Sequence, residues 1–267
     1  MPLQPVQTRI LRLLAQNRNP DSYIAGATAL HRSPESPRYS NDIDIFHDPR
    51  VSVGHCALTD EAVLRAQGHR VDWVLQAVTF WRAWVQVDDQ RIKLEWAQDS
   101  AFRFFPVEPD PELGYRLHWA DLATNKILAG AGRVAVRDFV DLVFLHEGWL
   151  SLGALAWAGT AKDPGLSPLF ILNELVRNSR YRPEDLQDVR LNRAVTLTEL
   201  KQTFVAAVQA AQELINRLPA HEVGCLYLDR AGQPVTPDPG SAEFAGLTRH
   251  FGSVRGSWPR VVREDGE

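Results

Sequence analysis

Two aspartates separated by a single residue constrain this chain more than any other feature. They lie in the run Asn41-Asp-Ile-Asp-Ile-Phe46, which is typical of a short strand. Successive residues of a strand point to opposite faces, so Asp42 and Asp44 should project together while Ile43 and Ile45 enter a core. Two like charges this close are unfavourable unless a cation lies between them. Such oxygen ligands suit Mg²⁺, which completes its shell with water and substrate phosphates. The pair therefore indicates phosphoryl or nucleotidyl transfer.

The residues before this run predict an anion-binding turn. Residues 23–30, Tyr-Ile-Ala-Gly-Ala-Thr-Ala-Leu, indicate a short strand, a turn at Gly26 and the start of a helix. A helix N-terminus exposes backbone N–H groups and the positive end of the helix dipole. A loop over residues 31–40 then leads to the acidic strand, an arrangement that would hold a triphosphate against a cation. Ser40, at the end of this loop, either donates a hydrogen bond to a phosphate oxygen or only ends the loop.

Composition predicts a globular protein of the cytoplasm with no membrane partner. Hydrophobic residues make up 45% and charged residues 23% of the 267 residues, as in ordinary globular proteins. No apolar run approaches the roughly 20 residues that span a bilayer, and residues 1–16 lack a signal-peptide core. Cys56 and Cys225 are far apart and have no metal-binding spacing, so we expect thiols rather than a disulfide.

The order of predicted elements indicates an α+β fold: a small mixed-sheet domain followed by a helical bundle. In the first domain we expect helices over 5–17 and 60–68, a β-rich stretch over 71–96 with a turn at 88–90, and a connecting loop or edge segment over 102–115. Later helices are expected over 120–131, 136–148, 152–159, 166–178, 183–189 and 198–218. A short strand is expected over 225–228. The predicted domains are residues 1–118, 119–218 and an irregular C-terminal segment, 219–267.

Four motifs in order resemble the AbiEii/AbiGii-type nucleotidyltransferase toxins, which have the polymerase-beta-like nucleotidyltransferase fold. Residues 26–30, Gly-Ala-Thr-Ala-Leu, and residues 40–44, Ser-Asn-Asp-Ile-Asp, are similar to the signature of that family. Residues 121–129 and 137–142 are similar to its lysine motif and its arginine–aspartate motif. The resemblance covers roughly residues 20–150. It implies transfer of NMP from an NTP to an acceptor hydroxyl by a toxin of a toxin–antitoxin or phage-defence pair, with tRNA as a possible acceptor and an antitoxin protein as a possible partner.

The resemblance also implies roles for individual residues. One or two Mg²⁺ ions would be held by Asp42 and Asp44, with Glu95 as the third ligand because strand alternation places Glu95 and Lys93 on one face. Lys126 would neutralise phosphate charge, and Asp141 would orient Lys126 or help activate the acceptor. The nucleotide-binding residues would be Gly26, Ala27, Ser40, Arg133, Arg137 and Asp138. Alternatively, Lys126 extends its ammonium from a buried face, Asp138 takes the role of Asp141, and Arg137 and Asp141 form an i,i+4 ion pair.

Two features keep other functions open. The family usually has two glycines where this chain has Gly26 and Ala27, and a methyl group there narrows the approach of a phosphate. A net charge of −4 does not favour a general nucleic-acid binder. Two basic groups either contact RNA phosphates or form a solvated helix face and a mobile tail: Arg177, Arg180, Arg182, Arg190 and Arg193, and Arg249, His250, Arg255, Arg260 and Arg263. The alternatives are a small-molecule acceptor such as an aminoglycoside, a protein acceptor, or a catalytically degenerate binding module.

Overall fold

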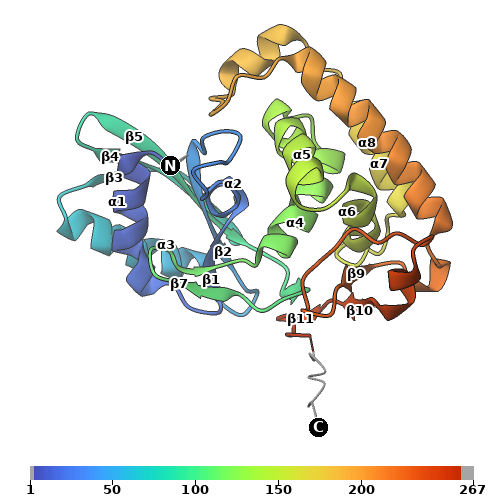
Figure 1. The fold of residues 1–267 in the computed structure, drawn as a ribbon. Helices are drawn as coiled ribbons and strands as arrows, with labels where there is room; N and C mark the ends of the chain where they lie inside the picture. The colour runs from blue at the N-terminus through green and yellow to red at the C-terminus, as the bar shows by residue number, and fades with distance from the viewer. Residues whose placement is uncertain (1–2, 260–267) are drawn as a thin grey trace. The chain divides into compact units, whose positions relative to one another are not determined.

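A computed structural model of the chain describes residues 3–259, which form two compact units (Figure 1). Unit 1 comprises the chain up to Ala101, Pro106–Leu122 and Arg190–Arg193. Unit 2 comprises Phe102–Phe105, Ala123–Val189 and the chain from Ala194 onwards. The three-domain division expected from the sequence stays a prediction.

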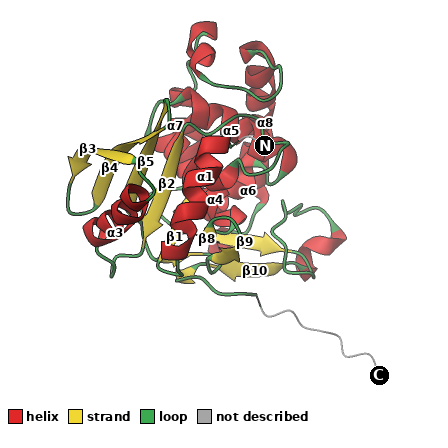
Figure 2. Ribbon diagram, turned by 90° about the vertical axis from the view of Figure 1, so that its left-hand side faces the viewer, coloured by secondary structure: helices red, strands yellow, loops and turns green. Residues whose placement is uncertain are grey.

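Unit 1 is built on a seven-stranded sheet with the order β3-β4-β5-β2-β1-β8-β7. The pairs β2–β5 and β1–β8 are parallel and the other neighbours are antiparallel, so the predicted mixed sheet is confirmed. Figure 2 shows the strands β3, β4, β5 and β2 side by side. The strands are β1 (Ser22–Ala25), β2 (Asp42–His47), β3 (Arg70–Gln76), β4 (Phe80–Val87), β5 (Gln90–Gln98), β7 (Glu108–Asp110) and β8 (Gly114–Arg116).

Three α-helices belong to unit 1, namely α1 (Pro5–Leu14), α2 (Gly26–Leu30) and α3 (Val53–Ala66), and a 3₁₀ turn at Ala15–Asn17 extends α1. The indole N–H of Trp96 on β5 donates a 2.7 Å hydrogen bond to Asp60 on α3. α3 therefore lies on the face of the sheet that carries Trp96. Glu95 points to the opposite face of the sheet, so α3 does not cover the carboxylates. A buried ion pair between Arg18 and Asp60, at 2.6 Å, ties α3 to the end of the first helical segment.

One prediction for unit 1 needs correction. The helix expected from residue 60 begins at Val53, because the Ser52 hydroxyl accepts a hydrogen bond from the His55 amide and caps it. Asp60, the first residue of the expected helix, is a buried mid-helix partner of Arg18. The segment 102–115, expected as a connecting loop or an edge segment, contributes β7 at the edge of this sheet, and β8 lies between β7 and β1.

Unit 2 contains the expected helices. α4 (Trp119–Gly132) begins in unit 1, and α5 (Val136–Gly148), α6 (Leu152–Gly159), α7 (Pro168–Asn178) and α8 (Leu197–Arg217) follow. The helix expected over 183–189 is a 3₁₀ helix, Pro183–Asp188. No single helix of residues 3–259 has the length and apolarity to cross a membrane; α5 and α6 meet that test only together, and they are bent by 111° where they join.

The C-terminal part is more regular than expected. The predicted strand β9 (Cys225–Leu228) pairs with β10 (Thr248–Phe251), and β6 (Phe102–Arg103) pairs with β11 (Ser253–Val254). Cys225 is a free thiol, as is Cys56, which confirms that prediction. Arg260 and Arg263 of the predicted basic tail lie outside the described residues.

Candidate metal and nucleotide site

Three carboxylates converge on one face of the sheet in unit 1. Asp42 and Asp44 lie on β2, and Glu95 lies directly across from Asp44 on β5. One oxygen atom from each of the three groups lies within 4.8 Å of the other two. Ile43 and Ile45 are fully buried on the opposite face, which confirms the predicted alternation. A cluster made only of hard oxygen donors at this spacing fits Mg²⁺.

Gly26 allows the chain to turn tightly beside Asp44. Its φ angle is +59°, in the left-handed region that favours glycine. A Cβ atom at this position would overlap the carboxylate of Asp44, so the turn and the carboxylate can be this close only because residue 26 is glycine. The following residue, Ala27, is 8% exposed, so its methyl group packs inside unit 1. The turn that the sequence predicts to receive a phosphate therefore adjoins the carboxylate cluster.

Ser40 lies at the start of β2, where its fully buried hydroxyl holds Asp42 in place. Ser40 Oγ donates to the main-chain oxygen of Asp42 at 3.0 Å and lies 3.4 Å from Asp42 Oδ1. Thr28 Oγ1 donates to the same main-chain oxygen at 2.6 Å, and Gln7 Nε2 donates to the main-chain oxygen of Ser40 at 3.0 Å. Thr28 and Gln7 were not predicted as part of the site, although Gln7 is a polar residue beside the apolar Val6, Ile10 and Leu11 of one helix.

Lys93 and Arg82, two cations of unit 1 that were not expected in the site, contact the carboxylates. Lys93 Nζ lies 3.0 Å from Asp42 Oδ2 and 3.0 Å from Glu95 Oε1. Arg82 Nε on β4 lies 2.8 Å from the same Glu95 oxygen. Burial lowers the pKa of Lys93, but the hydrogen bonds to Glu95 and Asp42 outweigh it and leave that pKa raised. Lys93 is therefore charged at neutral pH.

Residues of the predicted lysine and arginine–aspartate motifs form a cluster within unit 2. Lys126 Nζ on α4 lies 2.8 Å from Asp138 Oδ1 and 3.0 Å from Asp141 Oδ2, both on α5. Arg133 Nε lies 2.7 Å from Asp138 Oδ2. Burial raises the pKa of Asp138, but the charge of Lys126 and the hydrogen bond from Arg133 outweigh it, so that pKa is lowered. Arg137 lies one turn before Asp141 on α5 and is half-buried.

Lys126 has a structural role whatever its part in nucleotide binding. Its side chain is 9% exposed, and those of Asp138 and Asp141 are 1% and 0% exposed. Removing the ammonium would leave two buried carboxylates without this partner, a change that typically costs about 3–5 kcal/mol. Loss of activity in a Lys126 variant therefore needs a folding measurement beside it. The contact of Lys126 with phosphate stays a prediction.

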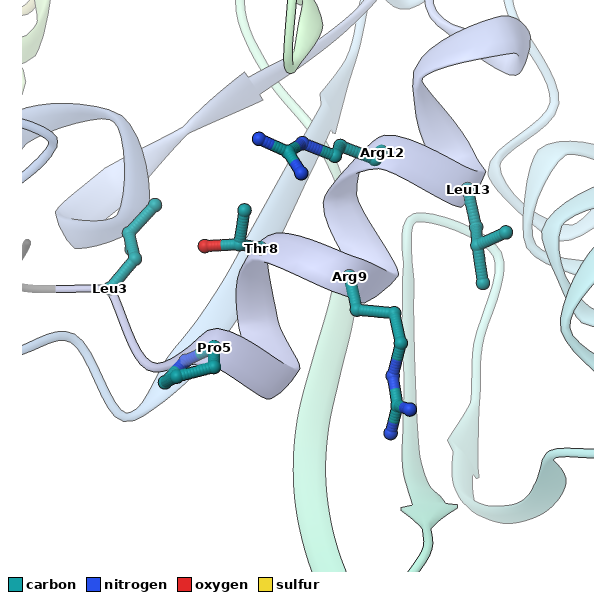
Figure 3. Close-up of a pocket in the computed structure, with 6 residues that line it drawn as sticks. All are labelled: Leu3, Pro5, Thr8, Arg9, Arg12 and Leu13. Carbon is teal, nitrogen blue, oxygen red and sulfur yellow. The ribbon is translucent and has the colours of Figure 1, made fainter.

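A shallow hollow on α1 is a further surface feature of unit 1. Figure 3 shows the side chains that line it, which are Leu3, Pro5, Thr8, Arg9, Arg12 and Leu13. Arg9 pairs with Asp88 and Arg12 pairs with Glu112, each at 2.6 Å. These arginines are thus already matched by carboxylates, and the hollow contains none of the predicted site residues.

Known structures resemble this chain in fold. No family model matches the sequence, and no curated protein matches it. A candidate nucleotidyltransferase from H. pylori is 19% identical, with a TM-score of 0.51 over 81% of this chain and 96% of that one. JHP933 from Helicobacter pylori is 18% identical, with a TM-score of 0.50 over 79% and 92%. MenT4, a nucleotidyltransferase toxin from Mycobacterium tuberculosis H37Rv, is 17% identical, with a TM-score of 0.53 over 81% and 83%. The chain therefore has a nucleotidyltransferase fold, shared with a nucleotidyltransferase toxin.

Proposed function

We propose that this chain is a metal-dependent nucleotidyltransferase that moves NMP from an NTP to an acceptor hydroxyl and releases pyrophosphate. The observation that carries the proposal is the meeting of Asp42, Asp44 and Glu95 oxygens within 4.8 Å, on a nucleotidyltransferase fold. The turn at Gly26 supports it further, because only a glycine lets the backbone approach the Asp44 carboxylate this closely. Catalysis would rest on positioning and charge neutralisation.

The proposed roles follow the chemistry of each group. Asp42 and Asp44, with Glu95, hold one or two Mg²⁺ ions, which neutralise the triphosphate and lower the pKa of the attacking hydroxyl. Ser40 and Thr28 keep Asp42 in position through its main-chain oxygen. The remaining assignments follow the family resemblance: phosphate neutralisation by Lys126, orientation of Lys126 by Asp141, and nucleotide contacts by Gly26, Ala27, Ser40, Arg133, Arg137 and Asp138.

We further propose that the protein is an AbiEii-like toxin of a toxin–antitoxin or phage-defence pair, acting in the cytoplasm on tRNA and restrained by a cognate antitoxin. The four ordered motifs and the fold shared with the toxin MenT4 support this proposal. A small-molecule or protein acceptor would use the same carboxylates, and a degenerate binding module would use the same fold without the reaction.

Labelled nucleotides test the proposed reaction. The wild-type chain is incubated with each α-labelled NTP, Mg²⁺ and total tRNA, and we expect label to enter RNA with at least one NTP. Asp42→Asn should lower this transfer by about 100-fold or more, because it removes a charge at the cluster. Asp72→Asn is the matched control, since Asp72 pairs with Arg70 on β3 and is 37% exposed.

The outcomes separate the alternatives. Label in a small molecule or a protein, and none in RNA, would keep the chemistry and reject the tRNA acceptor. No transfer with any NTP or acceptor would reject the reaction. In that case calorimetry with NTP and Mg²⁺ distinguishes a binding module, which releases heat, from a pocket that no longer binds.

A further inference from the structure

Lys93 lies within the carboxylate cluster rather than beside it. In the parallel pair β2–β5, Asp42 faces Lys93 and Asp44 faces Glu95. Because alternate residues of a strand share a face, these four side chains form two rows on the same face of the sheet. The ammonium group lies 3.0 Å from Asp42 Oδ2 and 3.0 Å from Glu95 Oε1. It therefore bridges the first and the third carboxylate.

Arg82 reinforces this arrangement from the neighbouring strand β4. Its Nε lies 2.8 Å from Glu95 Oε1, the same oxygen that contacts Lys93. One oxygen of Glu95 thus contacts two cationic side chains. The Lys93 side chain is 22% exposed and that of Arg82 is 37% exposed, so the charge on Lys93 is the less screened of the two.

The charges limit how many divalent ions this site can hold. Lys93 and Arg82 offset part of the charge of the three carboxylates, so a second divalent ion gains less from the cluster than the first. A second divalent ion between Asp42 and Glu95 would have to approach the Lys93 ammonium, and like charges at such short range repel strongly. Lys93 thus occupies the position between these carboxylates that a second ion would need.

We propose that Lys93 is a resident cation of this site and takes the place of a second metal ion. The site then binds one divalent ion rather than two, with Asp42, Asp44 and Glu95 around it, while Glu95 also holds Lys93 through its Oε1. This inference rests on the proposed function, for which it defines the metal stoichiometry. In that role Lys93 supplies a fixed positive charge beside the reacting groups.

Binding of Mn²⁺ alone to the full chain tests the stoichiometry, followed by the loss of the electron paramagnetic resonance signal of the free ion. We expect one Mn²⁺ for the wild type and one for Lys93→Arg, which retains the charge. Lys93→Met keeps a similar stem without the charge and should bind two. Lys93→Gln is a second variant without the charge, should the methionine variant fail to fold. Asp42→Asn should weaken binding of the first ion at least tenfold.

Each remaining outcome has a defined meaning. Two ions on the wild type, or a single ion on the variants that lack the charge, would overturn the role of Lys93 and leave the metal-dependent reaction in place. The variants that lack the charge could instead bind one ion more tightly than the wild type does. That result would show that metal displaces Lys93, which also overturns the inference. Absence of Mn²⁺ binding to the wild type would remove the metal site of the proposed function itself.

Discussion

His47, the last residue of β2, has a buried ring whose two nitrogen atoms have no hydrogen-bond partner among the described residues. Burial, together with the charge of Arg18, lowers the pKa of His47 to about 3. The ring is therefore neutral in the folded protein across the physiological range, whereas in the unfolded chain it takes up a proton below its ordinary pKa of about 6.5.

We predict that His47 makes the free energy of unfolding fall as the pH drops from about 6.5 toward 3. In this range the unfolded state binds the additional proton, so acid favours unfolding, and the loss at pH 5 should be about 2 kcal/mol. Urea unfolding of the wild type and of His47→Leu at pH 7 and pH 5 measures it. The variant should lose less stability than the wild type between the two values.

A suitable control is His221→Gln, because the His221 side chain is 82% exposed. That variant should keep the pH dependence of the wild type. An unchanged pH dependence in His47→Leu would show that the buried ring is not its source.

At the level of elements, residues 190–193 form hydrogen bonds to the loop that precedes β2; we call this segment the strap. The Asn192 amide donates to Pro37 O at 2.7 Å, and its side chain donates to Pro34 O at 2.8 Å and Ser36 O at 3.0 Å. Tyr39 N donates to Arg190 O at 2.9 Å, and the Arg190 guanidinium stacks over the Tyr39 ring at 4.3 Å. All of these residues belong to unit 1.

We predict that Asn192→Ala loosens this loop. The change removes two hydrogen bonds, worth about 1 kcal/mol each, so amide exchange of residues 33–40 should become faster by about tenfold or more. Hydrogen exchange read by mass spectrometry checks this. Asn178→Ala removes a similar pair of bonds, to Gly130 O and Ala131 O in unit 2, and should leave residues 33–40 unchanged. Equal exchange in wild type and Asn192→Ala would mean that the strap does not hold the loop.

The elements also show what could be predicted from the sequence. Strand alternation was enough to place Asp42 and Asp44 on one face of their strand, because it depends only on the period of two. Glu95, on another strand, was assigned to the same site only through the family resemblance. The beginning of α3 was predicted wrongly because the cap that starts the helix is Ser52, well before the expected start at Asp60. The contacts of Lys93 depend on which strand lies next to β5, and that pairing is a long-range property that periodicity does not contain.

At the scale of the whole molecule, the net charge of −4 bears on the nature of the acceptor. A chain with this charge gains no general attraction to RNA, so tRNA binding would have to come from local groups of arginines. Arg180 and Arg182 are exposed on either side of the buried Tyr181 in unit 2. They are therefore suitable positions at which to test whether RNA phosphates are contacted.

We predict that Arg180→Gln together with Arg182→Gln weakens tRNA binding and its dependence on salt. If each side chain contacts one phosphate, the slope of the logarithm of affinity against the logarithm of salt should become shallower by about 0.7–0.9 per arginine. Fluorescence anisotropy with labelled tRNA at several salt concentrations measures the slope. Arg217→Gln is the control, because Arg217 already pairs with Asp238 at 3.1 Å. Wild-type binding that does not change with salt would instead favour a small-molecule or protein acceptor, since contact with RNA phosphates releases counterions.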